Sequence, residues 1–263
     1  MANYANPKIY GFNYMQQTYG GTLSVSSGSS TMWYGTDNNK YTRWTSSSQS
    51  GTGDLAYWKR DFGVGRDINR IFVYQSNVVN INCVYGTSDT QLPNVTVTRS
   101  SNGMHSCFEF DSVNTTCFKL SGTSTITVNE EKYINEAYAM TEIGTFQYPV
   151  KFKGELVKSQ VDHKLESGRH FIINKGNALK GSLEFKSHVS TNDVALFNTL
   201  LFRDAEFHLW LNGGNEDQFN YPFYPYRFED MTKVSLQKSV KPSYTDNYYG
   251  SGLNAKVKIV EVE

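Results

Sequence analysis

Short runs of alternating apolar and polar residues, separated by turn-forming residues, dominate the first half of the chain. β-Branched or aromatic residues alternate roughly in eight segments, at 22–27, 70–75, 80–86, 95–100, 107–112, 116–122, 125–130 and 133–140. Asn, Ser, Gly and Asp fill the gaps, and alternation with period two is typical of half-buried strands. No helical period interrupts this half. We therefore expect an antiparallel β-sandwich or jelly roll.

The pattern changes near Pro149, which lies in a Gly- and Pro-containing segment. We place one domain at 1–148 and a second at 149–263. Longer strand-like stretches fill the second domain, together with one amphipathic helix candidate, "STNDVALFNTLLF". The predicted fold class is mostly β: an N-terminal antiparallel jelly-roll β-sandwich, then a β-rich domain with one packed α-helix near 191–202.

The charge balance argues against a nucleic-acid backbone as the main partner. The chain has 25 Lys and Arg against 25 Asp and Glu, and residues 1–148 carry 10 basic against 11 acidic side chains. Proteins that bind the phosphate backbone concentrate basic residues instead. The first residues, "MANYANPKIYGF", lack an apolar run, and no segment has the roughly 20 apolar residues that span a bilayer. We expect synthesis in a cytoplasm and no membrane insertion.

The sequence offers no catalytic constellation. It has no nucleophile elbow, no His-Glu-x-x-His, no phosphate-binding loop and no dinucleotide fingerprint. "GVGRDIN" at 63–69 contains Gly-x-Gly, but a strand follows it, so we interpret it as a turn. The three cysteines, Cys83, Cys107 and Cys117, lack metal-finger spacing and are expected to be buried thiols. We predict that the protein is not an enzyme.

Two aromatic stretches are candidates for binding. Trp33 and Tyr34 lie beside a turn in "TMWYGTDN", and Tyr224 and Tyr226 alternate with Phe and Pro in 219–228. Flat rings on stiff backbone make sugar-stacking platforms, and they also serve as anchors at protein interfaces. The same rings can simply close a core, so three interpretations stay open.

A polar run at 45–54 separates Trp44 from Trp58. It is rich in Ser, Gly, Gln and Thr, and it includes Ser47 and Gln49. Such a run is a linker, a sugar-binding loop or a rim held by its neighbours. As an exposed loop it is a place where recognition is commonly found, and we include Ser47 and Gln49 among the candidate ligand-binding residues.

The stretches "GTDNNKYTRWTSS", "LAYWKRDFG" and "DINRIFVYQSN" together resemble the discoidin, or coagulation-factor type C, branch of the galactose-binding-like jelly rolls. That family shows an Asp-x-Asn/Asp-x-x-Thr-x-Trp turn, a Trp strand ending in Asp-Leu/Phe-Gly, and a strand of the form Ile-x-x-Ile-x-Ile-Tyr. The matching positions are Asp37, Asn39, Thr42 and Trp44, then Trp58, Asp61, Phe62 and Gly63, then Ile68, Ile71, Val73 and Tyr74. The resemblance covers residues from about 10 to 145 and implies that Trp44 and Trp58 are anchors of the fold.

The resemblance also implies a structural Ca²⁺ in the first turn. Its ligands would come from Asp37, Asn39 and Thr42, with Glu136 in "YINEAYA" as a late carboxylate. Oxygen donors of this kind suit Ca²⁺. A turn held only by Asx hydrogen bonds is the alternative, and no cofactor is required in that case. The polar residues that line the sugar pocket of lectin members have no convincing match in this chain.

Residues 132–240 resemble, more loosely, bacteriophage tail-associated virion proteins, in which a galactose-binding-like domain precedes a β-rich domain of baseplate or tail-tip character. This resemblance implies a non-enzymatic tail or baseplate component that is made in the host cytoplasm and located in the virion. Its partners would be other tail proteins, arranged as a symmetric oligomer, with host cell-surface polysaccharide as a further partner. The alternative function is a lectin-like, carbohydrate-binding host-recognition protein.

Overall fold

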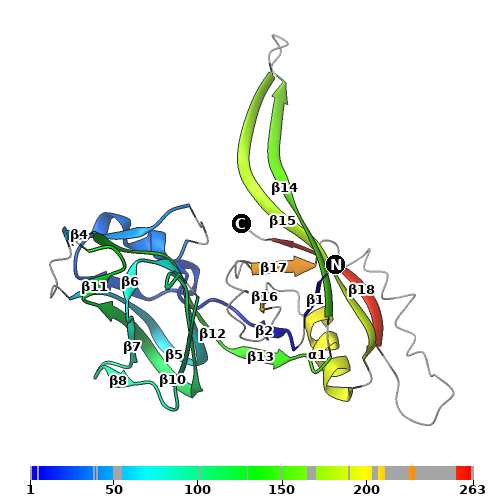
Figure 1. Cartoon of the computed structure of the whole chain (residues 1–263), viewed down its shortest axis with the longest axis horizontal. Coiled ribbons are helices and arrows are strands. Elements are labelled where there is room, and N and C mark those ends of the chain that lie inside the picture. Colours follow the sequence, from blue (N-terminus) through cyan, green and yellow to red (C-terminus); the bar gives the residue numbers. More distant parts are fainter. Residues whose placement is uncertain are drawn as a thin grey trace. The chain divides into compact units, whose positions relative to one another are not determined.

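A computed structural model describes residues 2–4, 6–37, 39, 41–49, 55–100, 102–128, 130–148, 150–164, 170–188, 190–202, 207–210, 225–228 and 253–261. These residues form two compact units (Figure 1). We call residues 10–142 the sandwich unit. We call the described residues of 2–9 and of 143–261 the hairpin unit.

The sandwich unit is built almost entirely from strands. Its elements are η1 (Gln17–Tyr19), β3 (Thr22–Val25), η2 (Ser29–Gly35), β4 (Trp44–Gln49), β5 (Ala56–Ser76), β6 (Val78–Val79), β7 (Asn82–Tyr85), β8 (Thr90–Gln91), β9 (Thr96–Arg99), β10 (Ser106–Gly122), β11 (Ser124–Thr125) and β12 (Glu131–Met140). The two η elements are short 3₁₀ helices. The predicted antiparallel jelly-roll sandwich is confirmed.

Two long, bent strands run through both layers of this sandwich. The first part of β5 pairs with β3 and with the end of β10, which in turn pairs with β7. The last part of β5 pairs with β12, and β12 also pairs with β4. The start of β10 pairs with β9. The two layers therefore share β5 and β10 and are joined by covalent backbone at the bend.

The interpretation of 63–69 as a turn is wrong, because this segment is the bend within β5. Gly63 has φ of +72°, a left-handed conformation that glycine adopts without strain. Register shifts in β10 between Glu109 and Val113, and between Thr115 and Cys117, let the partner strand follow the same bend. Turn-forming residues here curve a continuous strand instead of ending it.

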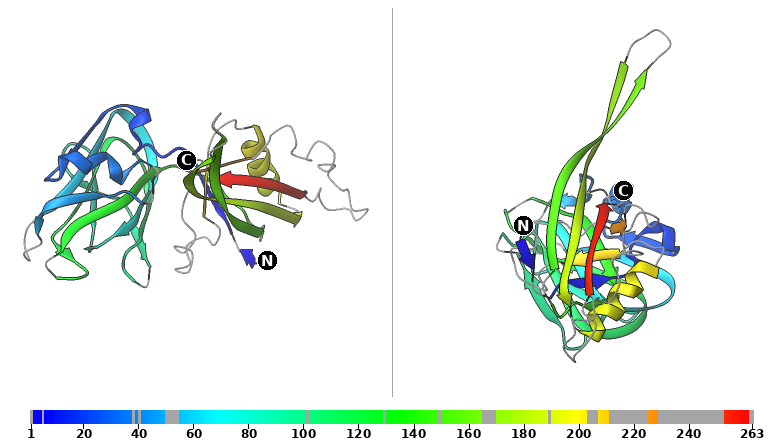
Figure 2. Two further views of the ribbon diagram at one scale, coloured as in Figure 1. Left: turned by 90° about the horizontal axis from the view of Figure 1, so that it is seen from above. Right: turned by 90° about the vertical axis from the view of Figure 1, so that its right-hand side faces the viewer.

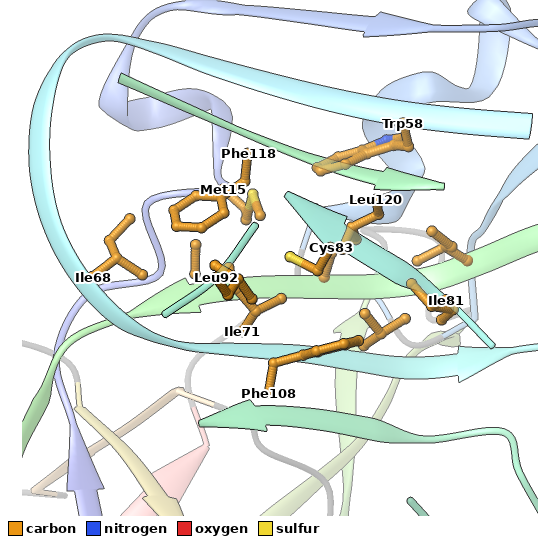
Figure 3. Close-up of a cluster of buried hydrophobic side chains, with 14 of the residues drawn as sticks. Met15, Trp58, Ile68, Ile71, Ile81, Cys83, Leu92, Phe108, Phe118 and Leu120 are labelled. Atoms are coloured by element: carbon orange, nitrogen blue, oxygen red, sulfur yellow. The ribbon is translucent and has the colours of Figure 1, made fainter. Parts of the chain in front are cut away.

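The core of the sandwich unit lies between its layers (Figure 3). Trp58, Phe118 and Leu120 come from one layer, and Ile71 and Phe108 come from the other. All three cysteines are buried free thiols, and burial raises the pKa of Cys83 and Cys117. Thiols with raised pKa are poor nucleophiles, so they serve as packing residues here.

The hairpin unit combines strands from both ends of the chain. Its elements are β1 (Ala2–Tyr4), β2 (Lys8–Tyr10), β13 (Glu142–Thr145), β14 (Val150–Lys164), β15 (His170–His188), α1 (Thr191–Phe202), β16 (Phe207–Trp210), β17 (Pro225–Phe228) and β18 (Leu253–Glu261). They form one sheet in the order β1-β14-β15-β18-β17-β16-β2-β13. β1 pairs with β14 at Ala2–Phe152, which explains why the first residues join this unit and not the one that follows them in sequence.

Helix α1 covers the core of the hairpin unit, as predicted for 191–202. Phe197 and Leu200 are buried, and the Phe197 ring lies 4.9 Å from that of Phe185 on β15. At the helix start, the Ser190 hydroxyl accepts a bond from the Asp193 amide, and the buried Asp193 carboxylate accepts bonds from the amides of Gln147 and Tyr148. In the part of the chain described, no helix is long and apolar enough to cross a membrane.

β14 and β15 extend as a two-stranded ribbon away from the rest of their unit (Figures 1 and 2). β1 pairs with β14 only at 150–152, and β18 pairs with β15 only at 180–188. Among the described residues, positions 155–164 and 170–179 have only one another as strand partners.

Candidate functional site

Two buried indoles hold the 3₁₀ helix η2 in place. Trp44 and Trp58 are almost completely buried. The Trp44 Nε1–H donates to the Ser27 carbonyl and the Trp58 Nε1–H donates to the Met32 carbonyl, each at 3.0 Å. Both tryptophans therefore anchor the fold and also fix the segment that carries Trp33 and Tyr34.

Glycine is required where η2 begins. Gly28 has φ of +70°, and a Cβ at this position would lie 1.9 Å from the Thr45 carbonyl oxygen. This close approach seats the start of η2 directly on strand β4. The backbone before Trp33 and Tyr34 is thus determined by contacts with β4.

The two predicted aromatic residues of η2 have different environments. Trp33 packs against the core, and its ring centroid lies 5.1 Å from the guanidinium carbon of Arg60. Tyr34 is 44% exposed. The structure makes Trp33 largely a structural residue and leaves Tyr34 available at the surface.

Arg60 is a buried residue that the sequence analysis missed. Its guanidinium donates to the carbonyls of Met15, Gln16 and Thr22 at 2.9–3.1 Å, and also to those of Gly20 and Asp61. Burial lowers the pKa of Arg60. Buried charges persist only when hydrogen-bonded, so Arg60 ties residues 15–22 to β5 beneath Trp33.

The predicted metal-binding loop is closed by its own side chains. The Asp37 carboxylate accepts a bond from the Asn39 amide at 2.9 Å, and the Asn39 side-chain oxygen accepts one from the Tyr41 amide at 3.1 Å. The Thr42 hydroxyl oxygen lies 2.9–3.0 Å from both Asp37 carboxylate oxygens and 2.9 Å from the Asn39 carbonyl oxygen. One hydroxyl proton cannot satisfy three acceptors, so oxygen atoms are in excess here.

The fourth predicted ligand, Glu136, is buried on β12. β12 pairs with β4 through Ile134 and Trp44, and extending this register by two positions places Glu136 level with Thr42. Beside the loop, the buried Thr36 hydroxyl has no hydrogen-bond partner among the described residues. These donors are all oxygens, as Ca²⁺ prefers. No group of three His, Cys, Asp or Glu side chains gathers in the described chain, so carbonyl and hydroxyl oxygens would have to complete such a site.

Tyr41 is a further surface ring that the sequence analysis did not single out. It is 71% exposed and lies within the Asp37–Thr42 loop. Next to it, the Arg43 guanidinium lies 4.4 Å from the ring centroid of Tyr133 on β12. The signal available in the sequence was an aromatic residue inside a motif otherwise made of turn residues.

The remaining candidate residues are not brought together with η2 by any contact the structure describes. Ser47 and Gln49 lie on β4, where Gln49 pairs with Glu131, and their side chains are outside the described residues. Tyr224 also lies outside the described residues. Tyr226 lies on β17 of the hairpin unit, paired with Phe207, and its side chain is not described.

Neither a scan against protein-family models nor a search of curated proteins gave a match. Solved structures similar to this chain include chitosan-binding module 1 of a chitosanase/glucanase from Paenibacillus sp. IK-5, with 17% identity over 49% of this chain and 98% of the module, at a TM-score of 0.40. A fucose-binding module of Streptococcus pneumoniae, SpX-3, has 12% identity over 49% of this chain and 98% of that one, at 0.38. The lectin domain of lectinolysin has 17% identity over 49% and 95%, at 0.36.

These neighbours are named as carbohydrate-binding modules and a lectin domain, and each covers about half of this chain.

Proposed function

We propose that the sandwich unit binds carbohydrate at the surface formed by η2 and the Asp37–Thr42 loop, and that the chain binds ligands without catalysing a reaction. The observation that carries this proposal is a pair of exposed tyrosine rings on fixed backbone. Tyr34 lies on η2, which the buried indoles hold, and Tyr41 lies in the loop that its own side chains close. Sugar rings stack their C–H faces on aromatic rings, and their hydroxyls bond to polar side chains. Asp37 and Asn39 supply such polar groups between the two tyrosines.

Rigid presentation favours binding at such a surface. An ordered loop loses little conformational entropy when a ligand docks, so more of the contact energy appears as affinity. The Asp37–Thr42 hydrogen bonds and the Trp44 and Trp58 tethers supply that order. Tyr34 and Tyr41 are therefore expected to act as stacking platforms.

The test is binding of the full chain to a glycan array that includes chitotriose and fucosylated glycans, followed by calorimetry on any ligand found. These probes are chosen because the similar solved modules are named for chitosan and fucose. Tyr34→Ala and Tyr41→Ala should each weaken binding by roughly tenfold, which corresponds to about 1.4 kcal/mol. Tyr148→Ala, at a 37% exposed ring in the hairpin unit, is the matched control. Unchanged affinity in both loop variants, or no binding to any glycan, would contradict the proposal.

We also propose that the Asp37–Thr42 loop holds a structural Ca²⁺, with Asp37, Asn39, Thr42 and Glu136 as ligands. Bound Ca²⁺ would supply charge that neutralises the surplus oxygens and would stiffen the loop beneath Tyr41. A ligand that binds only the folded state at 100 times its Kd stabilises by about 2.7 kcal/mol. Added Ca²⁺ should therefore raise Tm, EDTA should lower it, and Asp37→Asn should abolish both responses. A wild-type Tm that changes with neither reagent would contradict the metal site and favour a turn held by Asx hydrogen bonds alone.

A second function, which we also propose, is that of a structural component of a bacteriophage tail or baseplate, located in the virion, with tail proteins and further copies of itself as partners. The observation that favours it is the ribbon of β14 and β15. A two-stranded hairpin is at best marginally stable alone in water, and both edges of this ribbon are open among the described residues. Such a ribbon gains stability by packing against a partner.

The sequence of the ribbon keeps its alternation beyond the core. Near the core, Val150 and Phe152 of β14 and Leu183 and Phe185 of β15 are buried. Farther out, the sequence of β14 has Val157, Ser159, Val161 and His163 at every second position, with Lys158, Gln160 and Asp162 between them. Such alternation is typical of a strand that packs against other residues on one face.

Open strand edges pair readily with a further strand, so we expect this ribbon to associate with a second copy of itself. Sedimentation of the full chain should show a symmetric oligomer that Val161→Glu disrupts. Gln160→Glu adds the same charge at the neighbouring position of the strand, where the sequence is already polar, and is the control. A wild-type chain that stays monomeric at high concentration, or equal effects of the two variants, would contradict this proposal.

A further inference from the structure

A second cluster of aromatic rings lies elsewhere on the sandwich unit, around Arg66. Tyr14 and Tyr19 have ring centroids 5.5 Å apart, and Phe12 lies 5.6 Å from Tyr19. The Arg66 guanidinium carbon is 5.0 Å from the Tyr14 ring centroid. All four residues are half-buried, so each keeps part of its surface in water. We call Phe12, Tyr14, Tyr19 and Arg66 the Arg66 cluster.

Arg66 differs from the other two arginines of β5. Arg60 donates to backbone carbonyls, and Arg70 forms ion pairs with Glu109 at 3.1 Å and Glu142 at 2.5 Å. Arg66 has neither a hydrogen bond nor an ion pair within the described part of the chain, and its Nε atom is buried. A buried donor without an acceptor costs about 1–3 kcal/mol. The side chain as a whole is half-buried, so part of it stays accessible to an acceptor from outside the chain.

The neighbouring carboxylates do not serve this purpose. The Asp61 carboxylate accepts a bond from the Gly63 amide at 2.8 Å, and the Asp67 carboxylate accepts one from the Asn114 side chain at 2.8 Å. Both bonds lie at the bend of β5, and neither carboxylate pairs with Arg66 among the described residues. Arg66 is the cation of the cluster.

The backbone around the cluster is fixed by close glycine contacts. A Cβ on Gly65 would lie 2.5 Å from the Asn114 side-chain oxygen, and a Cβ on Gly21 would lie 2.0 Å from the Asp61 carbonyl oxygen. These approaches seat residues 20–21 and 63–65 against their neighbours. The rings on 12–19 and the guanidinium on β5 are therefore presented from ordered backbone.

We propose that the Arg66 cluster is a binding site for a carboxylated sugar, such as a uronic acid residue of an acidic polysaccharide. The guanidinium is planar and pairs with a carboxylate through two parallel hydrogen bonds. The rings of Tyr14, Tyr19 and Phe12 supply apolar surface for the face of a sugar ring. A nucleic-acid backbone fits poorly, because residues 10–142 carry nine basic against eleven acidic side chains.

This site is separate from the Tyr34 and Tyr41 surface and goes beyond the function proposed for it. The two sites share no residue. One combines tyrosines with acidic and amide groups, whereas the other combines them with a cation. Together, the two sites would let the sandwich unit bind an acidic glycan at one place and a neutral glycan at the other.

The experiment is calorimetric titration of the full chain with trigalacturonic acid, and with neutral galactotriose as the comparison, at low and at physiological salt. Arg66→Gln should lower the affinity for the acidic trisaccharide by roughly 10–100-fold, as expected for losing a charged hydrogen-bonded pair. Arg66→Lys keeps the charge but loses the planar pairing, so it should fall between wild type and Arg66→Gln. Arg99→Gln removes a charge from a half-buried arginine elsewhere and should leave affinity unchanged.

Thermal unfolding checks the fold of each variant. Tyr19→Ala tests the same site by removing one of its aromatic rings. If Arg66→Gln and Arg99→Gln lower the affinity for trigalacturonic acid equally, the effect comes from net charge alone and the proposal is overturned. So would equal affinity for the two trisaccharides, or no binding of the acidic one at millimolar concentration. Tyr34→Ala should not change trigalacturonate binding, so failure at this site leaves the proposal for the η2 surface standing.

Discussion

The sandwich unit and the hairpin unit use the same kind of strand alternation but enclose their apolar residues to different extents. In the sandwich unit, Trp44 and Trp58 are buried and both indole N–H groups have backbone acceptors. In the hairpin unit, the alternation continues along β14 and β15 beyond the strands that pair with them. Alternation alone therefore identifies strands, whereas pairing and hydrogen bonding decide which apolar residues stabilise the fold.

The largest loss of stability is expected at Trp58, in the core of the sandwich unit. Trp58→Ala should destabilise the sandwich unit by about 3–5 kcal/mol, because it removes a large buried ring and the tether of η2. Trp58→Phe keeps most of the ring and loses the bond to Met32, so its cost should be nearer 1–2 kcal/mol. Urea denaturation measures both values. A change below 1 kcal/mol for the alanine variant would show that the indole is not a structural anchor.

A pH-dependent loss of stability is expected at His105 in the same unit. Burial lowers the pKa of His105 to about 4, and its Nδ1 accepts a bond from the Gln75 amide at 3.1 Å. Between the unfolded pKa of about 6.5 and this value, only the unfolded chain takes up the proton. Stability should therefore fall by at most roughly 3 kcal/mol as pH drops through this window.

Urea denaturation at several pH values would show this loss. His105→Asn keeps a side-chain acceptor but does not titrate, so its profile should be flatter between pH 6.5 and 4. Identical slopes for the variant and the wild type would assign the acid sensitivity to other groups.

A smaller effect, confined to the hairpin unit, is expected at Asp193. Asp193→Ala removes the acceptor of the Gln147 and Tyr148 amides and should cost roughly 1–2 kcal/mol, as for the loss of a helix cap. Hydrogen exchange should accelerate at these two amides and in α1. Asp193→Asn retains one acceptor and should have a weaker effect. Equal acceleration in the strands of the sandwich unit would mean that the two units do not respond separately.

The smallest effect is expected at the proposed sugar platform. Tyr34→Ala and Tyr41→Ala should each change the free energy of unfolding by no more than about 0.5 kcal/mol, because both residues are exposed at the surface. Measured beside Trp58→Ala, they separate rings that make the fold from rings available for recognition. A loss above 2 kcal/mol in either variant would move that tyrosine into the structural group.

Much of the fold was predictable because local pattern and packing agree. The strand-rich jelly roll and the helix at Thr191–Phe202 follow directly from period-two and period-3.6 alternation. The bend at Gly63 was misjudged, because the same residue types end a strand or curve it, and only the partner strand decides between the two outcomes. The pairing of β1 with β14 brings together residues some 150 positions apart, which no local pattern indicates.

The candidate site was predictable in part for a similar reason. The resemblance to the discoidin turn implied that Asp37, Asn39 and Thr42 lie together, with Asx hydrogen bonds as one way to hold the turn, and the structure brings these three together. Arg60 was missed, because an arginine is expected at the surface unless buried carbonyls from distant residues surround it. Tyr41 and the Arg66 cluster were missed because they depend on exposure and on unmet hydrogen bonds, which appear only after folding.

The placement of the sandwich unit between β2 and β13 has a consequence for synthesis. Gly11 and Thr141 are joined by a backbone hydrogen bond of 3.0 Å, so the chain enters and leaves the unit at the same place. All strands of the unit have been made once residue 142 has been added to the chain. β1 must wait for β14, about 146 residues later, or roughly 7–30 s at the usual speed of translation. The ribosome therefore delivers a complete sandwich first, while the opening strand of the other sheet stays without its partner until the later strands arrive.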